Sequence, residues 1–194
     1  MMRPRVLEHG YGVGPKLLFK LVALMSGRPL PDAAKITFYR SDFYGTHMKK
    51  FTQEAMRGHS TWSVADRELM AAYVSEVNDC PFCVGAHTAT AGLAYQDRER
   101  VAAVLADLDS APIEEGLRAT LGMLGELTRE GTVSPDAIRP VISAGVSGQQ
   151  VEDALAVGFA FNTTDRLANA FAFHVLDQEG FEAGAKYLLK RGYG

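Results

Sequence analysis

Residues 63–95 read SVADRELMAAYVSEVNDCPFCVGAHTATAGLAY, and this stretch decides the fold. Apolar residues recur in it at spacings of three and four, the period of an α-helix. Ser63 is placed to cap a first helix, and Pro81 lies in the first turn of a second, where its missing N–H costs nothing. We therefore predict two consecutive antiparallel helices that turn near Asn78.

The same helical period continues through the rest of the chain. One apolar stripe ends at Gly131, a residue type that favours helix C-termini. Ser134-Pro135 predicts a further helix start, and a segment from Gln149 to about Asp177 is apolar around most of its circumference, which indicates burial. No prolonged strand candidate occurs, so the predicted fold class is all-α. The apolar stripe that ends at Gly131 consists of Ile113, Leu117, Leu121, Leu124 and Leu127.

The chain of 194 residues is expected to form a single domain, because about 150 residues is usual for one. We divide it into an N-terminal arm and helices (1–60), a core (61–177) and a C-terminal segment (178–194). The first part is rich in Gly and Pro and contains a helix-like stretch from Phe43 to Arg57.

Composition excludes several classes of protein. A net charge of −3 argues against nucleic-acid binding, and 47% hydrophobic with 22% charged residues is typical of a globular chain. The basic start, residues 1–5, is not followed by a leader pattern, and the apolar run 17–25 is too short to span a bilayer. We therefore expect a cytoplasmic protein without membrane association.

The chemistry is concentrated in residues 79–87, which read DCPFCVGAH. Two cysteines at the start of a helix are activated, because the free N–H groups and the helix dipole favour the thiolate. At about 100° per residue, Cys80 and His87 lie within roughly 60° of Cys83 on the helix surface. Both sulfurs and the imidazole therefore share one face, and His87 is close enough to Cys83 for proton exchange.

The spacing Glu68, eleven residues, Cys80-x-x-Cys83, three residues, His87 resembles the signature of the alkyl hydroperoxidase D-like proteins of the carboxymuconolactone decarboxylase family. The resemblance implies that the C-x-x-C pair reduces peroxides and that Glu68 and His87 relay protons. It further implies that Cys83 attacks the peroxide and forms a sulfenic acid, while Cys80 is the proton donor and resolving partner. Members of the decarboxylase branch lack the cysteine pair.

The chain departs from the best-studied members in two places. Pro81-Phe82 stands where they carry a histidine between the cysteines, and residues 1–60 have no counterpart that we can align.

Other interpretations of the cysteines stay open. The pair is compatible with an inert structural role, and a zinc site would require ligands beyond Cys80, Cys83 and His87. Haem attachment requires a histidine directly after the second cysteine, where Val84 stands, and no strand–helix–strand pattern indicates a thioredoxin-like fold. We expect no metal and no organic cofactor.

The carboxylate of the relay is ambiguous from the sequence. Glu68 lies nearly opposite the apolar stripe of its helix, so periodicity alone predicts a solvent-facing side chain. In the predicted helix pair, however, Glu68 lies about 15 Å before the turn and His87 about 13 Å after it, so the two are level. Glu76 is the rival carboxylate, level with the cysteines.

The remaining polar candidates have weaker signals. Asn162, Arg166 and Asn169 form a stripe on the predicted buried helix, which is typical of a hydrogen-bond network or a subunit interface, although contact with the active pocket stays open. The apolarity of 149–177 predicts self-association, hence a homo-oligomer. Four histidines lack partners at ligand or triad spacing: His9, His47, His59 and His174.

The expected reaction is the reduction of a hydroperoxide to an alcohol and water, with formation of a disulfide between Cys80 and Cys83. Electrons would come from an external dithiol, either a lipoyl group or a thioredoxin-like protein. Two alternatives are a general dithiol–disulfide oxidoreductase and a helical assembly protein that senses redox state without turnover.

Overall fold

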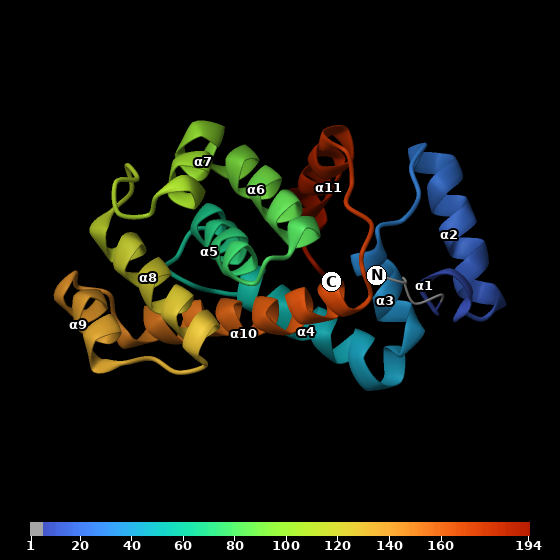
Figure 1. Cartoon of the computed structure of the whole chain (residues 1–194). Coiled ribbons are helices and arrows are strands. Elements are labelled where there is room, and N and C mark those ends of the chain that lie inside the picture. Colours follow the sequence, from blue (N-terminus) through green and yellow to red (C-terminus); the bar gives the residue numbers. More distant parts are fainter. Residues whose placement is uncertain (1–5) are drawn as a thin grey trace.

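The computed structural model describes residues 6–194, apart from the side chain of Phe43, so the basic residues 1–5 lie outside it. Every regular element in the described part is helical, which confirms the all-α prediction (Figure 1). None of the described helices is long and apolar enough to span a membrane. The elements are α1 (Val6–His9), α2 (Val13–Ser26), α3 (Asp32–Tyr39), the π-helical turn η1 (Ser41–Gly45), α4 (Thr46–Arg57), α5 (Val64–Val77), α6 (Pro81–Tyr95), α7 (Arg98–Ala106), α8 (Glu115–Glu130), α9 (Pro135–Ser143), α10 (Gly148–Ala170) and α11 (Gln178–Arg191).

The central pair α5 and α6 forms where the sequence predicts it. Ser63 caps α5 by accepting a hydrogen bond from the Asp66 backbone N–H, and the Asp66 carboxylate accepts one from the Ser63 N–H in return. α6 begins with Pro81 after the turn at Asn78. α5 and α6 pack along each other, and α10, α8, α7 and α11 surround them. The main apolar core lies between these helices, with Leu69, Met70, Leu121 and Leu124 fully buried.

The long C-terminal helix is shorter than predicted. α10 ends at Ala170, and the chain then runs without helix to Asp177. Ala172 adopts a left-handed conformation (φ 48°), which stops the helix although neither Gly nor Pro marks the position. Asp177 caps a separate helix, α11, by accepting from the Gly180 N–H. α11 packs against α6, so the C-terminal segment 178–194 contributes directly to the centre of the fold.

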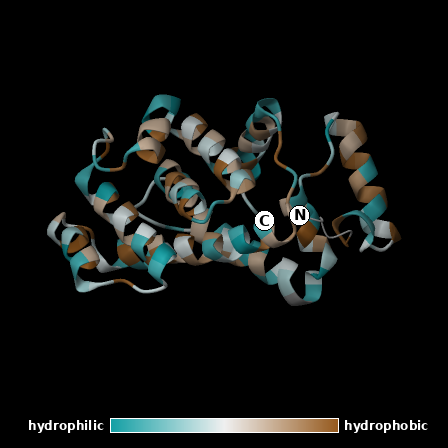
Figure 2. Ribbon diagram, viewed as in Figure 1, coloured by the Kyte–Doolittle hydropathy of each residue, from teal (hydrophilic) through white to brown (hydrophobic). Residues whose placement is uncertain are grey.

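The N-terminal part divides into two regions. α4 packs on α10 within the main body, whereas α2 lies at the periphery (Figure 1). α2 has no buried residue, although much of its ribbon has the colour of hydrophobic residues in Figure 2. Its apolar side chains are exposed, with Leu17, Leu24 and Met25 at 63%, 83% and 80% exposure. This apolar surface is distinct from the segment 149–177, which the sequence singled out for self-association.

Candidate active site

Both cysteines lie at the start of α6, where a local turn fixes them. Cys80 is the residue immediately before the helix, and Asp79 adopts the left-handed region (φ 49°). Asn169 of α10 donates its side-chain N–H to the carbonyl oxygens of Asn78 and Asp79, at 3.1 and 3.2 Å. These bonds hold the turn that precedes Cys80, so one residue of the predicted polar stripe positions the cysteine pair.

Cys80 and Cys83 are free thiols, and both are buried. They belong to an apolar cluster that includes elements from the N-terminal part of the chain. Leu7 of α1 and Ile36 of α3 are buried in this cluster, and Tyr44 of η1 packs against it. The first 60 residues therefore supply part of the cover around the cysteines.

The two thiols have opposite tendencies to ionise. A hydrogen bond from the Cys83 thiol, helped by the Cys83 backbone N–H, lowers the pKa of Cys80 despite its burial. The same contact with Cys80, together with burial and the Asp165 carboxylate, strongly raises the pKa of Cys83. In the resting reduced pair, the negative charge therefore favours Cys80.

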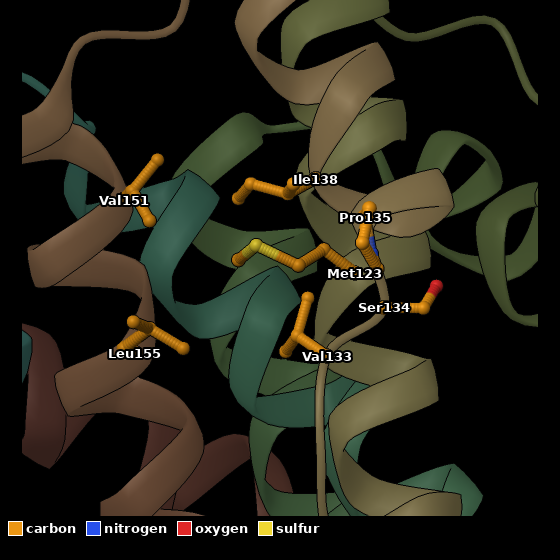
Figure 3. Close-up of a pocket in the computed structure, with 7 residues that line it drawn as sticks. All are labelled: Met123, Val133, Ser134, Pro135, Ile138, Val151 and Leu155. Atoms are coloured by element: carbon orange, nitrogen blue, oxygen red, sulfur yellow. The ribbon is translucent and has the colours of Figure 1, made fainter.

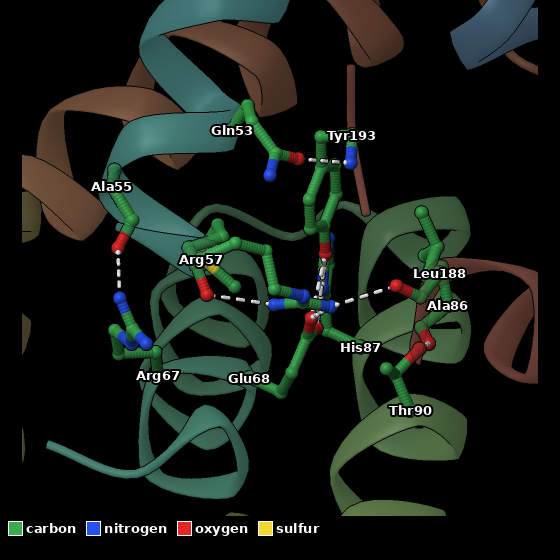
Figure 4. A network of polar contacts seen from close by, with 11 residues as sticks. Gln53, Ala55, Arg57, Arg67, Glu68, Ala86, His87, Thr90, Leu188 and Tyr193 are labelled. Atoms are coloured by element: carbon green, nitrogen blue, oxygen red, sulfur yellow. Dashed lines mark hydrogen bonds and ion pairs between the residues drawn. The ribbon is translucent and has the colours of Figure 1, made fainter. Parts of the chain in front are cut away.

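Glu68 and His87, the residues expected to relay protons, are paired across α5 and α6. The Nδ1 atom of His87 lies 2.8 Å from Oε2 of Glu68, and both side chains are buried (Figure 4). A carboxylate accepts, so Nδ1 is the donor of this hydrogen bond and Nε2 is the second ring nitrogen. Among the described residues, no hydrogen bond engages Nε2. His87 follows Cys83 by one helical turn on α6.

The interpretation of Glu68 from periodicity alone was wrong. Glu68 is 0% exposed, because α5 is covered on nearly all sides and the face opposite its apolar stripe meets α4 and the C-terminus rather than solvent. Glu76, the rival carboxylate, is exposed. The structure thus pairs His87 with Glu68, as the resemblance implied.

Two further residues bond to the Glu68 carboxylate, and the sequence reasoning missed both. Arg57, the last residue of α4, donates from Nη2 to Oε1 of Glu68 at 2.6 Å. The Tyr193 hydroxyl donates to the same carboxylate, lying 2.9 and 3.1 Å from its two oxygens. The Tyr193 backbone N–H donates to Oε1 of Gln53 at 2.6 Å, which fixes the C-terminus over the site. No motif spacing links these positions to residues 68–87.

These contacts decide the charge of the relay. Burial alone would raise the pKa of Glu68, but the hydrogen bond and charge of His87 and the Arg57 guanidinium outweigh it and lower the pKa. Burial and the neighbouring Glu68 charge raise the pKa of Tyr193 well above its usual value, so the phenol stays protonated. The site therefore holds an ionised carboxylate that orients His87.

A third buried acid, Asp165 of α10, faces the cysteines and was not singled out from the sequence. Ser75 donates its hydroxyl to Oδ1 of Asp165 at 3.0 Å, and Asn78 donates its side-chain N–H to Oδ2 at 3.0 Å. The two sulfurs and one Asp165 oxygen all lie within 4.8 Å of one another. Burial raises the pKa of Asp165, opposed by its hydrogen bonds and by the charge of His87.

Cys80, Cys83 and Asp165 are the described residues that could hold a metal ion. Zinc, which thiolates favour, is usually held by four ligands in a structural site and by three plus water in a catalytic one. Both Asp165 oxygens already accept hydrogen bonds, and the His87 ring is oriented by Glu68. The arrangement fits dithiol chemistry better than a metal centre.

The rest of the polar stripe forms a hydrogen-bond network. Asn162 accepts from Asn78 at 3.2 Å and donates to the Thr128 hydroxyl at 3.1 Å. Arg166 is exposed and donates to the side-chain and backbone oxygens of Asn162. The stripe therefore supports the turn before the cysteines. The four histidines without predicted roles are all exposed: His9, His47, His59 and His174.

A separate apolar hollow of about 340 Å³ lies between α8, α9 and α10 (Figure 3). Its lining includes Met123, Val133, Ile138 and Leu155, with the Ser134 hydroxyl as the one polar side chain. It contains none of the cysteine or relay residues and offers no acid, base or nucleophile beyond that hydroxyl.

The fold and site define a class: an all-helical protein with a buried C-x-x-C pair at a helix N-terminus and an adjacent carboxylate–imidazole relay. Several solved structures share this fold, two of them as follows. An uncharacterized peroxidase-related protein from Silicibacter sp. TM1040 is 21% identical, with a TM-score of 0.74 over 94% of this chain and 93% of that one. The alkylhydroperoxidase AhpD core of an uncharacterized peroxidase-related protein from Ralstonia eutropha JMP134 is 18% identical, with a TM-score of 0.71 over 95% of each chain.

Residues 44–124 match the model of the carboxymuconolactone decarboxylase family. No curated protein matches the chain. The family match includes Cys80, Cys83 and His87, and together with the shared fold it supports the resemblance, seen in the sequence, to the alkyl hydroperoxidase D-like proteins of that family.

Proposed function

We propose that the protein is a thiol-dependent peroxidase that reduces hydroperoxides with Cys80 and Cys83. The observation that carries the proposal is the ordered row of groups along α6: two buried thiols, then His87 one turn later, hydrogen-bonded to Glu68 at 2.8 Å. An inert structural pair of cysteines would not require an oriented, ionised carboxylate beside a basic imidazole.

In the proposed reaction, Cys83 attacks the outer oxygen of the hydroperoxide. Nε2 of His87 takes the thiol proton, an S–O bond forms, the O–O bond breaks, and the departing alkoxide receives a proton to become an alcohol. The sulfenic acid then reacts with Cys80, which forms the disulfide and releases water. Two electrons leave the cysteine pair and reduce the peroxide.

The attack by Cys83 depends on the relay. The electrostatics of the resting pair favour the thiolate on Cys80, so Cys83 becomes the nucleophile only when His87 removes its proton. Glu68, held by Arg57 and Tyr193, keeps the His87 proton on Nδ1 and stabilises the imidazolium that forms. General acid–base help of this kind contributes about 10² to 10⁴ in rate.

The surroundings of the thiols favour an organic hydroperoxide as the substrate. The cluster around the cysteines contains Ile36, Phe82 and Phe173, and an apolar alkyl group loses little on entering it. An external dithiol, either a lipoyl group or a thioredoxin-like protein, reduces the disulfide and completes the cycle. No metal and no organic cofactor take part in this cycle.

Turnover assays with single-cysteine variants test the proposal. Wild type should consume an organic hydroperoxide continuously when a dithiol is in excess. Cys83→Ser should abolish peroxide reduction, whereas Cys80→Ser should react once and stop with a sulfenic acid on Cys83, seen by mass spectrometry. A stable sulfenic acid on Cys80 in the Cys83→Ser protein would reverse the two roles.

The same assays separate the alternatives. Disulfide exchange with small dithiols in the absence of any peroxide consumption would identify a general oxidoreductase. Neither reaction would be expected of a protein that only senses redox state.

A further inference from the structure

Asp165 is a buried carboxylic acid that the proposed relay does not use. It is 0% exposed, and leaving an acid beside two buried thiols is costly in an apolar environment. The fold nonetheless holds its carboxylate in a defined position through Ser75 and Asn78, both at 3.0 Å.

Closing a disulfide between two thiols requires two proton movements. The second thiol must lose its proton before its sulfur can attack, because the thiolate is the nucleophile. The group that departs from the oxidised sulfur must gain a proton. Since both sulfurs are buried, a protein group has to carry this proton, and Asp165 is the acid whose oxygen lies within 4.8 Å of both sulfurs.

We propose that Asp165 is the acid–base catalyst of disulfide closure between Cys80 and Cys83. Its carboxylate takes the proton of the second thiol as that sulfur attacks the oxidised one. The S–S bond forms, and the bond from the oxidised sulfur to the departing group breaks. The Asp165 carboxylic acid then gives its proton to the departing group and returns to the carboxylate.

The departing group depends on the oxidant. It is hydroxide, released as water, when the oxidised cysteine is a sulfenic acid made by a hydroperoxide. It is a thiolate, released as a thiol, when the oxidised cysteine is in a mixed disulfide with a small disulfide. The inference rests on the redox activity of the cysteine pair in the proposed function, but not on the choice of peroxide as the oxidant.

The charges around Asp165 suit this role. Titratable groups that face the cluster are Cys80, Cys83 and His87 of α6 and Tyr44 of η1, while Ser75 and Asn78 are uncharged. Burial raises the pKa of Asp165 above its usual value, toward that of a thiol. A proton carrier works best when its pKa lies near those of its partners and the working pH.

Reaction of the reduced protein with 2-hydroxyethyl disulfide isolates the closing step. Mass spectrometry of quenched samples separates the mixed disulfide, formed by the first attack, from the closed Cys80–Cys83 disulfide. Asp165→Asn should accumulate the mixed disulfide, with closure about 10²-fold slower than in wild type. The first attack on 2-hydroxyethyl disulfide should not slow in Asp165→Asn, because removing the negative charge of Asp165 favours formation of the cysteine thiolate.

Asp153→Asn is the matched control. It makes the same change on α10, about 18 Å further toward the start of the helix, where Asp153 bonds to Ser60 and Gln149. Its closure should equal that of wild type. In Asp165→Asn, the new amide can donate to Ser75 and accept from Asn78, so the fold is expected to survive, as circular dichroism would verify.

Ser75→Ala gives an independent test that keeps the acid. Loss of the Ser75 hydrogen bond, which stabilises the ionised carboxylate, raises the pKa of Asp165. Because the carboxylate is the base, closure slows as pH falls through this pKa. The acid limb of the closure rate should therefore move to higher pH in Ser75→Ala, while the plateau rate at high pH is retained.

Folded Asp165→Asn that closes the disulfide as fast as wild type would overturn the assignment. So would a closure rate in Ser75→Ala with the same pH profile as wild type. If wild type closes the disulfide but consumes no hydroperoxide, slow closure in Asp165→Asn still supports Asp165 and refutes the peroxidase proposal. If wild type forms neither the mixed nor the closed disulfide and consumes no hydroperoxide, both are refuted.

Discussion

Replacing Glu68 by Gln tests the relay and the stability of the site together. The carboxylate forms an ion pair with Arg57 at 2.6 Å, in which the side chains are 0% and 11% exposed. The Gln amide can still accept a hydrogen bond, but the Arg57 guanidinium is left buried without its counter-charge. Breaking a buried pair in this way costs about 3 kcal/mol of unfolding free energy. The loss of the relay should lower the rate of peroxide reduction by about 10²-fold.

Stability and catalysis can be separated with a second substitution. Arg57→Met in the Glu68→Gln background removes the unpaired guanidinium, so part of the lost unfolding free energy should return while the peroxide reaction stays slow. Urea denaturation and hydroperoxide consumption measure the two effects. Glu76→Gln is the matched control on the same helix. Glu76 is exposed, so the unfolding free energy of Glu76→Gln should differ from that of wild type by no more than about 0.5 kcal/mol.

A particular pattern of results would refute this reasoning. If Glu68→Gln retains wild-type peroxide kinetics across the pH range while Glu76→Gln is crippled, the relay does not run through Glu68. If Glu68→Gln unfolds at the same urea concentration as wild type, the buried ion pair does not stabilise the fold as the contacts require.

Four further predictions follow from the structure. The pKa of Glu68 is lower in the folded protein than the usual value of about 4.3, so the ionised Glu68 stabilises the fold above that pH and this stabilisation is lost as pH falls through the lowered pKa. The difference in unfolding free energy between wild type and Glu68→Gln should therefore narrow in acid, and a constant difference would contradict this. Tyr193→Phe removes the hydroxyl bonded to Glu68 and should cost about 1 kcal/mol in urea melts, with a smaller loss of activity than Glu68→Gln; an equal loss would give Tyr193 a larger role. Gly85→Ala would place a Cβ 2.4 Å from the Phe181 ring and should destabilise by about 1–3 kcal/mol, whereas Gly122→Ala, with no heavy atom within 4 Å, should stabilise slightly in thermal melts; the reverse order would refute the packing of α11 on α6. We expect self-association through helical surfaces that include 149–177, and light scattering that finds an active monomer would contradict it.

Local signals in the sequence predicted much of the fold. The caps at Ser63 and Ser134 and the proline at position 81 start helices where expected, because capping depends on a few adjacent residues. The end of α10 could not be predicted in the same way. Ala170 is followed by no Gly or Pro, and the chain leaves the helix through a left-handed Ala172. Backbone hydrogen bonds from Ala172 N–H to the Asn169 oxygen and from Phe173 N–H to the Ala168 oxygen close the helix end.

The site was predictable only as far as its motif extends. Cys80, Cys83 and His87 lie within one helical turn or two, so their shared face follows from geometry. Glu68 was misplaced by periodicity, since a helix buried on several sides has no solvent-facing stripe. Arg57, Asp165 and Tyr193 reach the site from α4, α10 and the C-terminus, and no local pattern records such contacts between distant segments.

The central claim is that Cys80 and Cys83 form one two-electron redox centre, and a stoichiometric titration tests it most directly. The fully reduced protein, kept without oxygen, is treated with one equivalent of an organic hydroperoxide, and free thiols, alcohol and peptide masses are then measured. The account predicts the loss of both thiols, one alcohol per protein and a disulfide between Cys80 and Cys83. Intact thiols beside unconsumed hydroperoxide would contradict it.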